Sequence, residues 1–208
     1  MKLKNLLLIS TAIALMFFSS ACINEGRTDP EKDIATAPEK DIITGKIDYA
    51  WYDSIDALYK KADLVIKGKV LGSRVEWMSH VIEPTAEEKS DPVLNPGGEI
   101  DDDDEMITTI YTVEISVVYK GSAGKTIDVL QLGGETDTAT YSYEGTPEIT
   151  INKEYILFLS ESTLYENAAW LLNNAQALYK VEGNDLIKLP KNTLELTYED
   201  LTRLEESQ

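Results

Sequence analysis

The chain of 208 residues contains a single cysteine, Cys22. No disulfide bond can therefore form within one chain, and a folded domain has to be held together by its packed apolar side chains alone. The residues from 48 to 208 are enough for one domain with a hydrophobic core. The cysteine thus limits the fold to one that is stable without covalent cross-links.

The residues before Cys22 have the pattern of an export signal. Lys2 and Lys4 precede an uncharged run from Leu6 to Phe18, LLLISTAIALMFF. This run is shorter than the ~20 apolar residues that span a bilayer. The sequence Ser-Ser-Ala-Cys follows at 19–22. Small residues let a peptidase bind extended backbone, and the thiol can accept a lipid. The segment resembles the lipobox of bacterial lipoproteins, although that family usually has leucine where this chain has its first serine.

The resemblance implies cleavage before Cys22, a lipid attached to this cysteine, and localisation on the outer face of the cell membrane. Residues 1–21 are then a signal peptide, and residues 22–47 a lipidated N-terminus and flexible tether. The tether is poor in large apolar side chains and repeats PEKDI at 30–34 and 38–42. An ordinary secretory cleavage near Cys22 is the alternative.

The charge balance excludes several classes of partner. The formal net charge is −18, and removing residues 1–21 takes away Lys2 and Lys4 but no acid, which gives about −20. A field of this sign repels phosphates. We therefore expect no nucleic acid partner and no direct adhesion to anionic lipid headgroups.

Residues 83–105 combine three prolines, a Gly-Gly pair and a run of acids, which predicts a long acidic surface loop. The candidate metal ligands in this loop are Asp101, Asp102, Asp103, Asp104 and Glu105. Ca²⁺ prefers such oxygen ligands, but calcium loops alternate acids with spacer residues. A solvated charge run is the alternative interpretation, and we expect no other cofactor.

The remaining segments alternate mainly as strands do. Strands are predicted at 63–77, 106–119, 126–132 and 154–159, and a hairpin at 177–181 and 186–189. A helix is predicted at 51–62 with Asp53 or Ser54 as its cap, and a second one after Thr197 with Leu201 and Leu204 facing inward. These elements predict a mostly-β fold: a small barrel of five to six strands with flanking helices.

Several of these segments resemble a family of secreted and lipoprotein-type proteins of Gram-positive bacteria. The shared blocks are ADLVIKGKV at 62–70, YTV to YKG at 111–121, LGG at 132–134, and GTP followed by EYILFL between 145 and 159. The blocks cover roughly residues 55–160, and the resemblance implies an OB-like barrel related to netrin and TIMP-type modules. We expect the whole domain to comprise residues 48–208. It implies no particular activity.

Sequence motifs for catalysis are weak. GSAGKT at 121–126 lacks the first glycine of a phosphate-binding loop, since Tyr119 stands there, and a strand follows it rather than a helix. His80 is the only histidine, and no G-x-S-x-G is present. We therefore expect no enzyme.

Tyr141 and Tyr143 are the candidate ligand-binding residues, because they share one face of a strand and OB barrels bind ligands through such faces. Core packing of both rings is the alternative. The sequence thus predicts a non-enzymatic binding module at the cell envelope, whose partner is an envelope protein or a glycan. The alternatives are a carboxylate-dependent envelope hydrolase and a protease-inhibitor-like domain. TIMPs use a free N-terminal cysteine, which a lipidated Cys22 could not provide.

Overall fold

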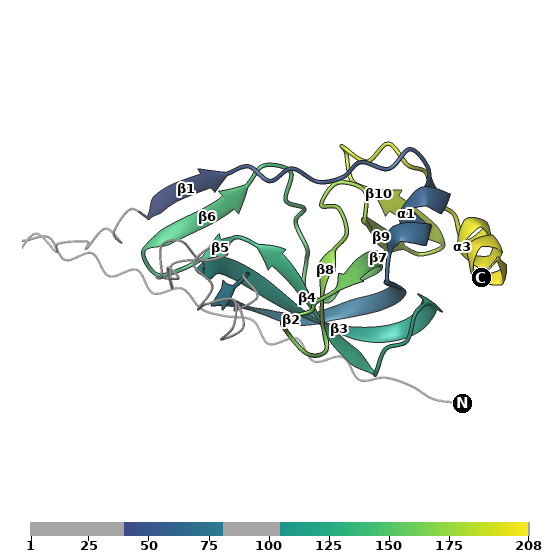
Figure 1. Ribbon diagram of the computed structural model, residues 1–208, viewed down its shortest axis with the longest axis horizontal. Coiled ribbons are helices and arrows are strands. Elements are labelled where there is room, and N and C mark those ends of the chain that lie inside the picture. Colours follow the sequence, from purple (N-terminus) through teal and green to yellow (C-terminus); the bar gives the residue numbers. More distant parts are fainter. Residues whose placement is uncertain (1–39, 81–104, 208) are drawn as a thin grey trace, which may run out of the picture. The chain divides into compact units, whose positions relative to one another are not determined.

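The computed structural model describes residues 40–80 and 105–207 (Figure 1). The described residues form ten strands: β1 (Asp41–Gly45), β2 (Leu64–Ser79), β3 (Glu105–Lys120), β4 (Thr126–Leu132), β5 (Gly134–Glu135), β6 (Ala139–Tyr143), β7 (Glu154–Glu161), β8 (Ala168–Leu171), β9 (Leu178–Glu182) and β10 (Asp185–Lys188). They also form helices α1 (Ile55–Lys61) and α3 (Tyr198–Glu206). No described helix has the length and apolar character that crossing a membrane requires.

Five of these strands make an OB-like barrel. β2 pairs antiparallel with both β3 and β7, and β3 pairs antiparallel with β4. The short β8 joins β4 in parallel and β7 antiparallel, through three residue pairs each. The sheet therefore curls so that its strands pair in the order β2–β3–β4–β8–β7, and β7 pairs again with β2. Beyond β7, the sheet continues with β9 and β10. The predicted mostly-β, OB-like fold with flanking helices is confirmed.

The core is centred on β7, the most apolar strand outside the N-terminal run. Its residues Tyr155–Leu159 are all at most 2% exposed and belong to one hydrophobic cluster with Leu58 of α1 and Leu201 of α3. A strand that is buried on both faces needs a continuous apolar run rather than an alternating one. Each such side chain contributes about 1.5–3 kcal/mol of burial free energy, so β7 anchors the barrel without a disulfide.

β2 and β3 are 16 residues long each and form a ribbon that extends past the barrel. Register shifts between Val65 and Ile66, between Lys67 and Gly68, and between Val70 and Gly72 bend β2. Gly68 lies so close to β3 that a Cβ built on it would come within 2.4 Å of Val113 Cγ1. The outer part of the ribbon pairs Gly72–Ser79 with Glu105–Thr112.

A second, three-stranded sheet contains a strand that differs from expectation. The tether was predicted to run through residue 47, but Asp41–Gly45 form β1, which pairs in parallel with β6. Lys40 Nζ bonds Glu135 Oε1 at 2.6 Å and the Thr136 carbonyl at 2.7 Å. These partners lie about a hundred residues away, which is why the local sequence pattern does not show them.

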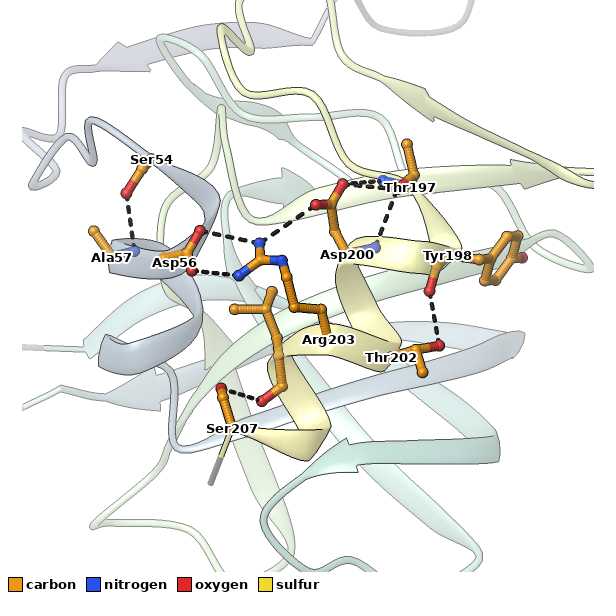
Figure 2. A network of polar contacts seen from close by, with 10 residues as sticks. Ser54, Asp56, Ala57, Thr197, Tyr198, Asp200, Thr202, Arg203 and Ser207 are labelled. Atoms are coloured by element: carbon orange, nitrogen blue, oxygen red, sulfur yellow. Dashed lines mark hydrogen bonds and ion pairs between the residues drawn. The ribbon is translucent and has the colours of Figure 1, made fainter.

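The two helices begin at the predicted caps and contact each other. Ser54 Oγ accepts from the Ala57 amide at 3.2 Å, and Thr197 forms a reciprocal capping box with Asp200. Figure 2 shows the Arg203 guanidinium between Asp56 of α1 and Asp200 of α3, with bonds of 2.7 and 3.2 Å to the Asp56 carboxylate. The hydrogen bond from Arg203 lowers the pKa of Asp56. This exposed pair joins the two helices of the described residues, which are far apart in the sequence.

Candidate functional site

A groove of about 370 Å³ lies on the outside of β2, β3 and β4, where the ribbon leaves the barrel. Strand residues alternate between the two faces of a sheet. Val113 and Ile127 point into the main core, whereas Ile110 and Leu130 point outward. We call this concavity the outer-face groove.

The floor of the outer-face groove is apolar and well packed. Met78, Ile110, Leu130 and Ala168 form a separate cluster that is between 1% and 7% exposed, with Tyr165 and Trp170 packed against it. The Tyr165 hydroxyl donates to the Ser79 carbonyl at 2.8 Å, and its amide donates to Ser162 Oγ at 3.1 Å. The first bond attaches the loop between β7 and β8 to the end of β2, and the second lies within that loop. The wall of the groove that this loop forms is therefore held in place.

The rim is polar and centred on Arg74. Its guanidinium bonds Asp128 Oδ2 at 2.9 Å and Glu76 Oε1 at 2.8 Å. Thr112 Oγ1 donates to the other Asp128 oxygen at 2.9 Å. The hydrogen bond to Asp128 is the main reason why the pKa of Arg74 is raised. This network fixes a cation and two anions at the groove edge.

The net charge of the lining is negative. Four carboxylates line the outer-face groove against the single guanidinium of Arg74: Glu76, Glu105, Asp128 and Glu166. Glu105 and Glu166 are exposed and come from β3 and from the loop between β7 and β8. A concave acidic surface raises the local concentration of cations.

His80 lies on the same outer face. Its ring centroid is 5.0 Å from that of Trp170, and Nε2 lies 3.1 Å from Thr108 Oγ1. Thr108 Oγ1 donates to the Met106 carbonyl at 3.2 Å, so this oxygen is placed to accept from Nε2–H. Burial lowers the pKa of His80, which favours the neutral ring.

The predicted ligand-binding residues lie outside the groove. Tyr141 and Tyr143 are half-buried on one face of β6. Tyr141 makes an edge contact with Trp77, with ring centroids 5.6 Å apart. Tyr143 covers Gly45, where a Cβ would come within 2.5 Å of its ring. Tyr141 therefore packs the small sheet against β2, whereas Tyr143 packs against β1 within the small sheet, and both rings keep part of their surface exposed.

Of the predicted metal ligands, Glu105 is the first residue of β3 and lines the groove. Asp101, Asp102, Asp103 and Asp104 lie outside the described residues, as does the predicted lipid attachment site Cys22. Among residues 40–80 and 105–207, no three metal-binding side chains come together as a site.

Arg74, Asp128 and Tyr165 were not predicted from the sequence. Asp128 is the one acid in the alternating run TIDVLQL, which is the only local signal that an outward polar group sits there. The groove joins residues that are up to 94 positions apart in the sequence, from Arg74 to Ala168. No protein-family model matches this sequence, and no curated protein matches it.

Proposed function

We propose that this protein is an exported, membrane-anchored lipoprotein whose OB-like domain binds a cationic segment of an envelope protein in the outer-face groove. The observation that carries the proposal is the groove itself, an apolar floor surrounded by four carboxylates and one guanidinium. The strand face of OB barrels, with the loops that flank it, is a common ligand-binding surface.

The charge of the lining determines the kind of partner. An apolar floor beside Glu105 and Glu166 suits a peptide that presents an aliphatic or aromatic side chain next to lysine or arginine. The whole chain has a net charge of −18, so long-range attraction acts in the same direction. Arg74 is held by Asp128 and Glu76, and we assign its remaining donors to a backbone carbonyl of the proposed partner.

The groove carboxylates support binding better than hydrolysis. Both Glu76 and Asp128 accept hydrogen bonds from Arg74, an arrangement that orients the guanidinium and occupies the acids. The other two groove carboxylates, Glu105 and Glu166, are exposed, whereas a carboxyl that transfers a proton in a hydrolase is typically shielded from solvent. We therefore propose a binding role without catalysis.

Export and anchoring rest on the N-terminal sequence. The charged start, the uncharged run at 6–18 and Ser-Ser-Ala-Cys at 19–22 support cleavage before Cys22 and lipid attachment there. Such an anchor would keep the acidic domain next to envelope partners.

The test compares two double variants that change the net charge equally. Glu105→Gln with Glu166→Gln neutralises the groove, whereas Glu199→Gln with Glu205→Gln neutralises two acids of α3. Both acids belong to α3, and Glu205 lies near Tyr119, about 30 Å along β3 from Ile110 by strand geometry. The full chain in detergent is immobilised, and capture of solubilised envelope proteins is quantified at low and moderate salt.

We expect the groove double variant to capture its main protein partner about three- to tenfold less than wild type, because each lost ion pair contributes on the order of 0.5 kcal/mol or more. The α3 double variant should behave as wild type does. Equal loss in both double variants would refute a groove site and leave only the overall charge as the cause of binding.

A further inference from the structure

A second concave site lies beneath the segment that connects β1 to α1. Figure 1 shows this segment, residues 46–52, running from one element to the other, and we call it the strap. At its start the Glu144 amide donates to the Gly45 carbonyl at 3.0 Å. At its end Asn173 Nδ2 donates to the Ala50 carbonyl at 2.7 Å. The strap is therefore held at both ends.

The end of the strap is also fixed at Tyr52. Gln176 is fully buried, and its side-chain amide accepts from the Tyr52 amide and donates to the Tyr52 carbonyl, at 2.9 Å each. The Gln176 side chain thus makes the two hydrogen bonds to the Tyr52 backbone that a neighbouring strand would make. It holds Trp51, the adjacent residue, at the edge of the cavity.

The space between the strap and the domain is about 480 Å³. Ile47, Tyr49 and Trp51 line it from the strap, while Gly145, Asn174 and Ala175 line it from the other side. We call it the strap pocket. Its volume is in the range of small-ligand sites in proteins.

Two neighbouring asparagines have different roles in the strap pocket. Both the nitrogen and the oxygen of the Asn173 side-chain amide are bonded within the protein. Nδ2 donates to the strap, and Oδ1 accepts from the backbone amides of Ala175 and Gln176 at 2.7 and 3.0 Å. Asn174 is only 4% exposed, yet its side-chain bond in the described structure is a 3.5 Å contact from Nδ2 to Thr146 Oγ1. A bond of this length is weak.

The Asn174 side chain can form more hydrogen bonds than it makes within the protein. In the described part of the chain no fully buried side-chain nitrogen or oxygen lacks a hydrogen-bond partner. Asn174 lines the strap pocket and has one long side-chain hydrogen bond, so we assign its remaining donor and acceptor positions to that space. The floor thus offers one planar group that can both donate and accept.

The rim offers an aromatic surface and balanced charge. The Trp51 side chain is 59% exposed although it is large and apolar. Lys46 and Lys191 stand against Asp48 and Glu144, and the Lys191–Glu144 pair is 3.7 Å apart with both side chains more than 60% exposed. The strap pocket therefore has no preference for either sign of charge.

From this combination we infer that the strap pocket binds a neutral sugar ring of a glycan. The ring's apolar face would stack on the Trp51 indole, and its hydroxyl or acetamido group would bond the Asn174 amide. A second cavity of about 580 Å³ shares Gly145, Ala175 and Lys191 with the pocket, so a longer saccharide can continue along this surface. The site shares no lining residue with the outer-face groove and stands independently of it.

The test titrates the full chain in detergent with the β-1,4-linked tetramer of N-acetylglucosamine and follows binding by saturation-transfer NMR and calorimetry. Trp51→Ala removes the stacking surface, and Trp77→Ala is the matched control, since the Trp77 side chain is 53% exposed on β2. Asn174→Ala removes the floor amide.

We expect saturable binding by wild type, a loss of about tenfold or more in affinity for Trp51→Ala and for Asn174→Ala, and a change of less than about twofold for Trp77→Ala. Trp51 is exposed, so its replacement decides the result even if Asn174→Ala fails to fold. The inference is overturned if the tetramer does not bind, or if Trp51→Ala binds it as tightly as wild type does.

Discussion

The buried polar side chains of this domain hold loops in place. Gln131 Nε2 donates to the Pro147 carbonyl at 3.0 Å, and Asn192 Nδ2 donates to the Gln176 carbonyl at 3.3 Å. Gln131 and Asn192 are at most 5% exposed. A buried amide that finds its partners stabilises a unique loop position, whereas one without partners costs about 1–3 kcal/mol. Gln131 therefore fixes Pro147 in the wall of the cavity next to the strap pocket, and Asn192 bonds the residue, Gln176, that holds the end of the strap.

At the residue scale, His80 gives a pH-dependent prediction. Burial lowers its pKa in the folded protein below the ordinary value of about 6.5. Its contribution to stability is therefore present above about pH 6.5, where the ring is neutral in both states, and is lost as the pH falls through the lowered folded value. The unfolding free energy of wild type should then fall more steeply on acidification than that of His80→Gln.

Urea denaturation of both proteins between pH 8 and pH 5 measures this difference. The acids titrate in both chains, so the comparison isolates the imidazole. Parallel stability curves for wild type and His80→Gln would show that the environment of His80 does not affect its protonation.

At the element scale, the sequence predicts best what local patterns control. β7 is visible as EYILFL, and α3 as a capping box followed by Leu201 and Leu204, which are 0% and 3% exposed. β1 and β8 escape prediction because they are short and are held by distant partners, β6 for the first and β4 with β7 for the second. The outer-face groove depends on β8 and its loop, so the sequence could not predict the groove.

Gly68 and Gly72 offer a matched pair of substitutions within β2. A Cβ on Gly68 would meet Val113 Cγ1 at 2.4 Å and the Glu114 carbonyl oxygen at 3.0 Å, whereas a Cβ on Gly72 would meet nothing within 4 Å. We expect Gly68→Ala to lower the unfolding free energy by about 1–3 kcal/mol through overpacking. Gly72→Ala should leave it unchanged or slightly higher.

Thermal or urea unfolding of the two variants measures the contrast. Equal stability of Gly68→Ala and wild type would mean that β2 and β3 separate easily at this point, contrary to the close approach described above.

At the scale of the whole molecule, charge and topology act together. The net charge of −18 favours a cationic over an anionic partner, and this follows from the sequence alone. The location of the proposed site required the structure, because Arg74, Glu105, Asp128 and Glu166 come from four different elements or loops. Tyr141 and Tyr143 are the sequence candidates. Tyr141 packs against Trp77 of β2 and so joins the two sheets, whereas Tyr143 packs against Gly45 of β1 within the small sheet.

The central claim is that a lipid-anchored domain binds an envelope protein through the outer-face groove. Photo-crosslinking in living cells tests it most directly, with a photoreactive amino acid placed at Glu166 on the groove rim or at Glu199 on α3, in chains with Cys22 or with Cys22→Ser. We predict a discrete protein adduct from position 166 in the membrane fraction, little from position 199, and loss of the membrane adduct with Cys22→Ser. Equal adducts from both positions, or a membrane adduct that persists without Cys22, would contradict the account.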